Sequence, residues 1–124
     1  MDVVVEVGGW EHECCGPAIE RNQLVDFECI RYTGPGGDVH LTETHHGLDV
    51  PAGERVSGRV LDLQVVQDGG DSLPILRVPS GPALRAFNED DDGHLEDPWV
   101  GDVIPLRGTE FLVTVRTTHP ERVP

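Results

Sequence analysis

Helix-breaking residues are spread along the whole chain and restrict its fold more than any other feature. The 15 glycines and 10 prolines make up about a fifth of the 124 residues. Glycine destabilises a helix interior through its backbone entropy, and proline does so through its missing N–H. Long helices are therefore nearly excluded, and the β-branched segments between the breakers predict strands.

Several of these segments have the alternation or β-branched content of strands. They are residues 3–7, 24–32, 38–44, 55–67, 73–78, 103–107 and 110–117. Within 24–32, Val25, Phe27 and Cys29 fall on one face, so Cys29 is expected to be buried. The last two segments, joined by Gly108-Thr109, predict a hairpin.

The segment 55–67 changes the phase of its apolar residues halfway along. Its apolar positions are first Val56, Gly58 and Val60, and then Leu61, Leu63 and Val65. A change of phase within one strand predicts a bulge or a sharp bend, and a bent strand favours a closed sheet. Pro74 requires that the following strand lie at an edge or begin near this residue.

These patterns predict an all-β fold, a small and partly closed antiparallel β-barrel that is SH3-like or OB-like. About six strands are expected, with at most one short helix, in 82–87 or near 42–48. No change of composition marks a linker. Residues 1–124 are therefore expected to form a single domain.

Charge restricts the partners that such a domain can have. The formal net charge is −14, and all nine basic residues are arginine. Phosphate backbones and anionic lipids are repelled, so nucleic acid and membrane partners are excluded in favour of an unknown protein or small molecule. No apolar run is long enough to span a bilayer and no basic N-terminal region is present, which predicts a cytoplasmic protein.

The cysteines and histidines form one candidate metal or thiol site. Three cysteines, two of them adjacent, do not make the paired framework of a secreted disulfide protein, so reduced thiols are expected. Cys14, Cys15, His45 and His46, with His12 nearby, could supply ligands to zinc. Neither Cys-x-x-Cys nor His-x-x-x-His is present. The commoner roles, a packed cysteine and a solvated histidine, need no cofactor.

The acidic segment Asn88–Glu96 partly matches a calcium-binding loop. Oxygen-bearing side chains stand at the first, third and fifth positions, and Gly93 stands at the sixth. The twelfth position, where a bidentate glutamate is needed, is Trp99. A solvated acidic turn is therefore the favoured interpretation.

Two tryptophans are candidates for a binding site. Trp10 and Trp99 each lie beside an irregular polar segment. Packing at the rim of a small barrel is the commoner role for such residues, and recognition is the alternative because tryptophan is enriched at contact surfaces.

Three short motifs occur in a fixed order along the chain. They are Trp10-Glu11-His12-Glu13-Cys14-Cys15-Gly16, then His45-His46-Gly47-Leu48 with Gly58-Arg59-Val60, and finally Asp97-Pro98-Trp99 before Phe111-Leu112-Val113. In this order they resemble a family of small proteins from high-GC bacteria that is known only as a domain of unknown function. The resemblance implies no activity, ligand or catalytic residue.

No complete catalytic set can be identified in the sequence. No serine lies in a Gly-x-Ser-x-Gly elbow, and no glycine-rich loop leads into a helix that could hold phosphate. A small barrel also has little room for an interior active site. The favoured function is a non-catalytic binding or interaction module, and the alternative is a zinc- or thiol-dependent protein that uses the Cys-Cys-Gly and His-His-Gly segments.

Overall fold

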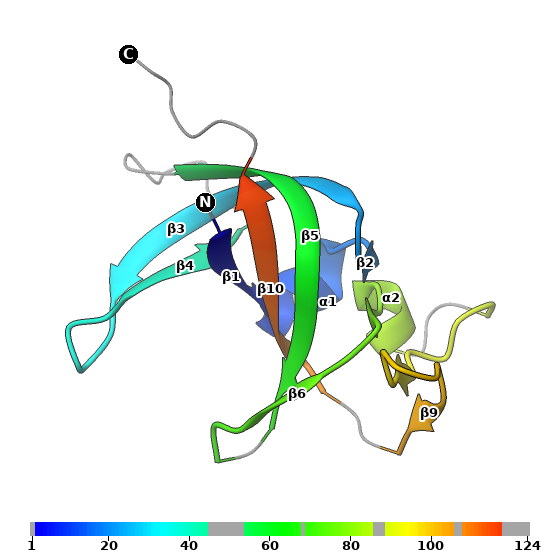
Figure 1. The fold of residues 1–124 in the computed structure, drawn as a ribbon. Coiled ribbons are helices and arrows are strands. Elements are labelled where there is room, and N and C mark those ends of the chain that lie inside the picture. The colour runs from blue at the N-terminus through cyan, green and yellow to red at the C-terminus, as the bar shows by residue number, and fades with distance from the viewer. Residues whose placement is uncertain (1, 45–53, 68, 86–88, 106–107, 118–124) are drawn as a thin grey trace.

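The computed structural model confirms the all-β class (Figure 1). It describes residues 2–44, 54–67, 69–85, 89–105 and 108–117, without the side chains of Trp10, Glu11, Cys15 and Glu54. Strands dominate, and both helices are short. In the part of the chain that is described, no helix is long and apolar enough to span a membrane.

Five strands form a ring. They are β1 (Asp2–Gly8), β3 (Leu24–Thr33), β4 (Val39–Glu43), β5 (Glu54–Val66) and β10 (Glu110–Thr117). The order is β10-β1-β4-β3-β5, and β5 pairs with β10 to close the ring. Neighbours are antiparallel except for the parallel pair β1–β4. Strand β6 (Ser72–Pro74) extends the sheet as an edge, which confirms the position expected of Pro74.

The predicted irregularity in β5 is confirmed and lies at Leu61. Thr114 of β10 is opposite Asp62, whereas Val115 is opposite Val60, so Leu61 is an extra residue on β5. The bulge keeps apolar side chains inward on both sides of the bend, because Val60 and Leu63 are both fully buried. The strand curves over one end of the ring and pairs with both β3 and β10 (Figure 1).

The core consists of the inward-facing residues of the ring strands. Phe111, Val113 and Val115 alternate inward along β10, as the pattern predicted. Cys29 is completely buried and is a free thiol, as expected for its face of β3. Burial of this continuous apolar surface is the main source of the stability of the fold.

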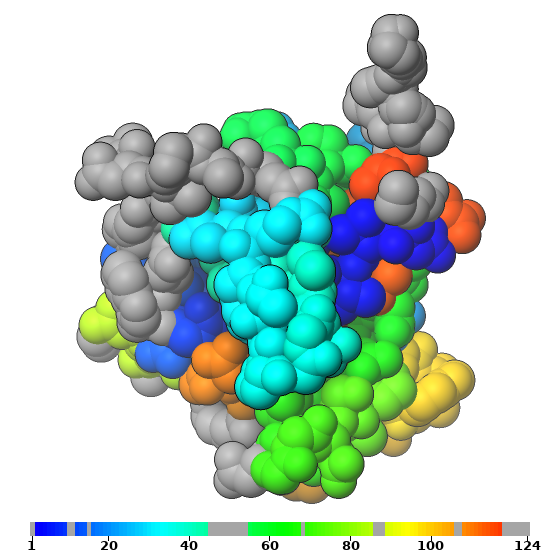
Figure 2. Space-filling view, turned by 90° about the vertical axis from the view of Figure 1, so that its left-hand side faces the viewer, coloured from blue at the N-terminus to red at the C-terminus, as the bar shows by residue number. Residues whose placement is uncertain are grey.

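A polar cluster joins β1 to β4, where only two residue pairs are in register. The Glu6 carboxylate accepts hydrogen bonds from Tyr32 Oη (2.6 Å), His40 Nδ1 (2.8 Å) and Thr42 Oγ1 (3.0 Å). The Tyr32 and His40 rings are stacked with centroids 5.0 Å apart, and the bond to Glu6 raises the pKa of Tyr32. Figure 2 shows this face, with β3 and β4 in cyan beside the dark blue β1.

The expectation of at most one short helix is wrong. Helix α2 (Gly81–Leu84) overlaps the predicted 82–87 segment, and the hydroxyl of Ser80 caps it by accepting from Ala83 N at 3.2 Å. The unexpected helix α1 (Gly9–Cys15) directly follows β1. Gly9 has a φ of 65°, which favours glycine and turns the chain out of β1 into the helix. The Gly81 N–H donates to the Gly16 carbonyl at 2.9 Å and ties the two helices together.

The predicted hairpin between 103–107 and 110–117 is also wrong. Strand β9 (Val103–Ile104) pairs with β8 (Leu95–Glu96), whereas β10 pairs with β1 and β5. The alternation identified strand-forming segments but carried no information about their partners. A second small sheet pairs β2 (Ile19–Glu20) with β7 (Arg77–Val78).

Candidate functional site

The segment 89–104, an acidic loop followed by the β8–β9 hairpin, lies outside the ring on the side of β7 and α2 (Figure 1). Leu95 is fully buried and packs with the main core. The Leu76 N–H donates to the Glu96 carbonyl at 2.8 Å, which ties the hairpin to the chain beside β7. Leu95 and this backbone bond both attach the segment to the fold, and Ile104 packs against the core as well.

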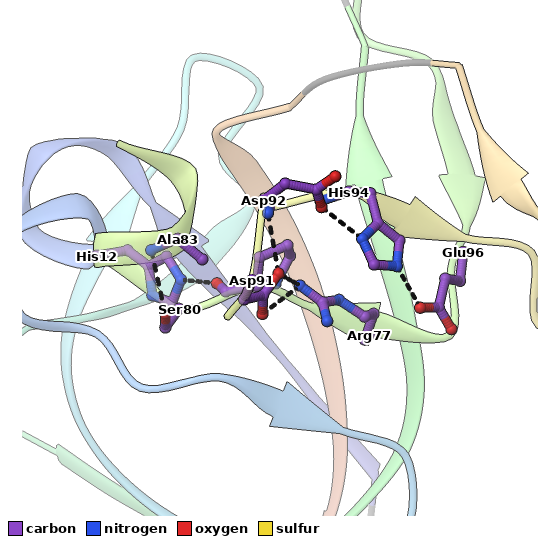
Figure 3. A network of polar contacts seen from close by, with 10 residues as sticks. His12, Arg77, Ser80, Ala83, Asp91, Asp92, His94 and Glu96 are labelled. Carbon is purple, nitrogen blue, oxygen red and sulfur yellow. Dashed lines mark hydrogen bonds and ion pairs between the residues drawn. The ribbon is translucent and has the colours of Figure 1, made fainter. Parts of the chain in front are cut away.

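An ion pair holds the acidic loop against β7. Arg77 Nη2 donates to both carboxylate oxygens of Asp91, at 2.6 and 2.7 Å (Figure 3). Both side chains are about four-fifths buried, with 20% and 21% of their surface exposed. The hydrogen bond from Arg77, together with one from the Gly93 N–H, lowers the pKa of Asp91. The pair therefore acts as a charged anchor for the loop.

His94 lies between two carboxylates (Figure 3). Its Nδ1 is 2.6 Å from Asp92 Oδ1, and its Nε2 is 2.5 Å from Glu96 Oε2. A neutral imidazole has only one N–H to donate, so both contacts are hydrogen bonds only when the ring is protonated. The bonds to Asp92 and then Glu96 raise the pKa of His94, and the same ring lowers the pKa of Asp92.

We expect the stability of the loop to depend on pH through His94. The folded protein raises the pKa of His94 above its usual value of about 6.5. The protonated ring therefore stabilises the folded state fully below about pH 6.5, and this stabilisation is lost as the pH rises through the raised pKa. An NMR titration of the imidazole should show this, and the pKa should fall in Glu96→Gln. A pKa of His94 at or below its usual value would contradict the two hydrogen bonds of its ring to Asp92 and Glu96.

Asp91, Asp92 and His94 also place one potential metal-ligating atom each within 4.8 Å of one another. In the structure these atoms bond to protein groups: Arg77 contacts Asp91, and His94 contacts Asp92. Asn88, the first position of the predicted calcium loop, lies outside the described residues. The described part is a hydrogen-bonded acidic turn, but Asp91 is mostly buried in its pair with Arg77 and is not solvated as the favoured interpretation expected. Binding of calcium to this segment stays a prediction.

The turn of the hairpin presents an apolar tip. Trp99 is 75% exposed, Val100 69% and Val103 64%, and we call these three residues the Trp99 tip. Asp97 fixes the turn: its carboxylate accepts from the Trp99 N–H at 2.7 Å, and its carbonyl accepts from the Gly101 N–H at 2.8 Å. The rim-packing interpretation is therefore wrong for Trp99. The side chain of Trp10 lies outside the described residues.

The candidate zinc residues are only partly described. Cys14 is exposed and disulfide-bonded, which differs from the expectation of reduced thiols. A disulfide sulfur is not the thiolate that zinc binds, so Cys14 is not a zinc ligand in this structure. The side chain of Cys15, and His45 and His46 entirely, lie outside the described residues, so a zinc site that uses them stays a prediction. His12 is two residues from Cys14 on α1 and is 1% exposed, so the two side chains do not share a face.

His12 has a structural role that the sequence did not reveal. Its Nε2 donates to the Pro79 carbonyl at 2.7 Å, and its ring meets Phe111 edge-on with centroids 6.0 Å apart. The side chain thereby links α1 to the segment before α2 and to the core. No local pattern around His12 indicates this role, because both contacts lie far away in sequence.

A cleft of about 300 Å³ lies beside the acidic loop. Its lining comes from β2 and the residues after it, from β7 and from β8: Glu20, Arg21, Asn22, Leu76, Arg77 and Glu96. The sequence could not reveal this site, because three distant segments build it. No protein-family model, curated protein or solved structure matches the chain. The functional argument consequently depends on the geometry of the tip and the cleft.

Proposed function

We propose that the protein is a non-catalytic binding module that contacts a protein partner through the Trp99 tip. The observation that carries this proposal is the exposed indole of Trp99 on a turn that hydrogen bonds hold in place. Tryptophan is enriched among residues that dominate binding energy. A fixed turn also loses little conformational entropy on binding.

The charges around the tip indicate the chemistry of its partner. Segment 89–104 contains seven carboxylate residues and neither lysine nor arginine. An apolar tip with this acidic surround fits an apolar segment that is flanked by basic residues. A second copy of the chain is a poor fit, because each copy carries a net charge of −14.

The polar side chains of the acidic loop and of Arg77, which anchors it, support a binding role over a catalytic one. Arg77 is bonded to Asp91, and both nitrogens of His94 are bonded to carboxylates. A general base needs a free nitrogen within reach of a substrate proton. In this arrangement, His94 instead joins the loop to the hairpin.

We expect removal of the indole to abolish most of the binding. A library of random 12-residue peptides displayed on phage is selected on the immobilised protein, and the enriched peptides are then measured by calorimetry. Trp99→Ala should weaken their binding at least tenfold, since hot-spot residues contribute about 2 kcal/mol or more. The melting temperature should not change, because the side chain is mostly exposed.

Two valines of similar exposure provide the matched control. Val103 in the tip and Val39 on β4 are 64% and 57% exposed. Val103→Ala should weaken peptide binding, whereas Val39→Ala should not. The proposal is wrong if no peptide is enriched, or if the enriched peptides bind Trp99→Ala as tightly as the unaltered protein.

A further inference from the structure

We propose that the cleft between β2, β7 and β8 binds an organic cation, an alkylammonium or guanidinium group, between the carboxylates of Glu20 and Glu96. This site is distinct from the Trp99 tip, although Glu96 belongs to the same hairpin. The inference depends on which of the charged groups in the cleft are already bonded and which are not.

The two arginines that line the cleft are used within the protein. Arg21 Nη2 donates to Asp62 Oδ1 at 2.8 Å, and Arg21 Nε donates to the Ile75 carbonyl at 3.1 Å, so this side chain braces the bulged part of β5. Arg77 is directly opposite Glu20 in the β2–β7 pair, yet its guanidinium bonds to Asp91. The arginine charges are therefore neutralised by aspartates and not by the glutamates of the cleft.

Protein donors use only part of the acceptors of the cleft. Among the residues that the structure describes, neither carboxylate oxygen of Glu20 has a hydrogen-bond donor, and Glu96 uses only Oε2, toward His94. The Asn22 side chain adds an amide oxygen without a described partner. Carboxylate and amide oxygens on two sides of one cleft are suited to the several N–H donors of an ammonium or guanidinium group.

The remaining features of the cleft favour a cation that has an apolar part. Leu76 supplies an apolar contact for a methylene chain. A volume of about 300 Å³ is at the lower end of ligand cavities, which suits a small amine. The net charge of −14 attracts cations and repels anions. Arg77 Nε lacks an acceptor among the described residues, but protein atoms enclose it, so an anion in the cleft does not reach it.

The cation could belong to a free amine or to a lysine side chain of a partner. Both carry the same ammonium group on a methylene chain, and a test with two probes separates them. One probe is 1,5-diaminopentane, and the other is the peptide acetyl-Gly-Lys-Gly-amide. The uncharged control is 1,5-pentanediol, which has the same chain length and no ammonium group.

We expect both charged probes to shift the backbone amide signals of Glu20, Asn22, Leu76 and Glu96 in an NMR titration, while pentanediol shifts none of them. Tighter binding of the peptide would indicate a partner's side chain, and tighter binding of the diamine would indicate a free amine. The double variant Glu20→Gln/Glu96→Gln should weaken binding at least tenfold. Trp99→Ala should leave it unchanged, so failure at the cleft is distinguishable from failure of the proposed function.

A charge-matched control excludes a general effect of the negative field. Asp38→Asn/Asp71→Asn removes the same two charges at exposed positions away from the cleft. It should change binding of the diamine less than twofold. The proposal is overturned if the two double variants lose affinity equally, if pentanediol binds as well as the diamine, or if neither charged probe shifts the cleft signals.

Discussion

Replacing Gly58 by alanine is expected to lower the free energy of unfolding by about 3 kcal/mol, the upper range for overpacked sites. Gly58 faces inward on β5, opposite Thr117 of β10. A Cβ atom at this position would lie 2.0 Å from the Arg116 carbonyl oxygen, which is backbone and cannot rotate away. The β5–β10 pair, which closes the ring, would have to separate. The total free energy of unfolding of a small domain is about 5–15 kcal/mol, so this loss is large.

Gly36 provides the matched control for this substitution. It lies in the turn between β3 and β4, and a Cβ there would come no closer than 3.6 Å to another atom, the carboxylate oxygen of Asp38. Urea denaturation followed by circular dichroism should show Gly36→Ala within about 0.5 kcal/mol of the unaltered protein. If Gly58→Ala is equally stable, then the close approach of β5 to β10 is wrong.

Replacing Leu95 by alanine is expected to cost about 2–5 kcal/mol, the range for a large apolar side chain deleted from a core. Leu95 is fully buried and belongs to the hairpin that presents the Trp99 tip. Its loss leaves a cavity between the hairpin and the core. We therefore expect binding at the tip to weaken as well, because the turn is no longer held against the ring.

Leu24 tests whether burial is the cause of this effect. Leu24 begins β3 and is 63% exposed, so Leu24→Ala removes the same atoms from a position that is mostly in solvent. It should change the free energy of unfolding by no more than about 0.5 kcal/mol. Equal losses in the two variants, measured by urea denaturation, would contradict the packing of Leu95 in the core.

The sequence predicted those features of the fold that the pattern of apolar residues within a single strand specifies. The change of apolar phase in 55–67 predicted a bulge or bend within the correct strand, and the structure has a bulge there at Leu61. The period of two in β10 placed Phe111 and Val113 inward. In both cases the buried face is specified locally, because a shift of one residue would expose every apolar side chain.

The failures concern features that depend on contacts between distant segments. Strand β9 pairs with β8 and not with β10. Tertiary contacts decide this pairing, and the alternation of apolar residues in β9 is compatible with either partner. Helix α1 is seven residues long, too short to be stable alone, and is held by contacts such as that of His12 with Pro79. Of the candidate site, the sequence identified Trp99 but favoured packing over recognition for it, and it missed the cleft entirely.

The polar cluster at the β1–β4 boundary has a consequence for the mechanics of the molecule. The ring is least extensively paired at this boundary, where β1 and β4 have only two residue pairs in register. The Glu6 carboxylate of β1 strengthens this boundary, because it accepts hydrogen bonds from Tyr32 of β3 and His40 of β4. Separation at this boundary would leave every antiparallel ladder intact. Of the neighbouring ring strands, β1 and β4 therefore have the fewest residue pairs to break when the ring comes apart.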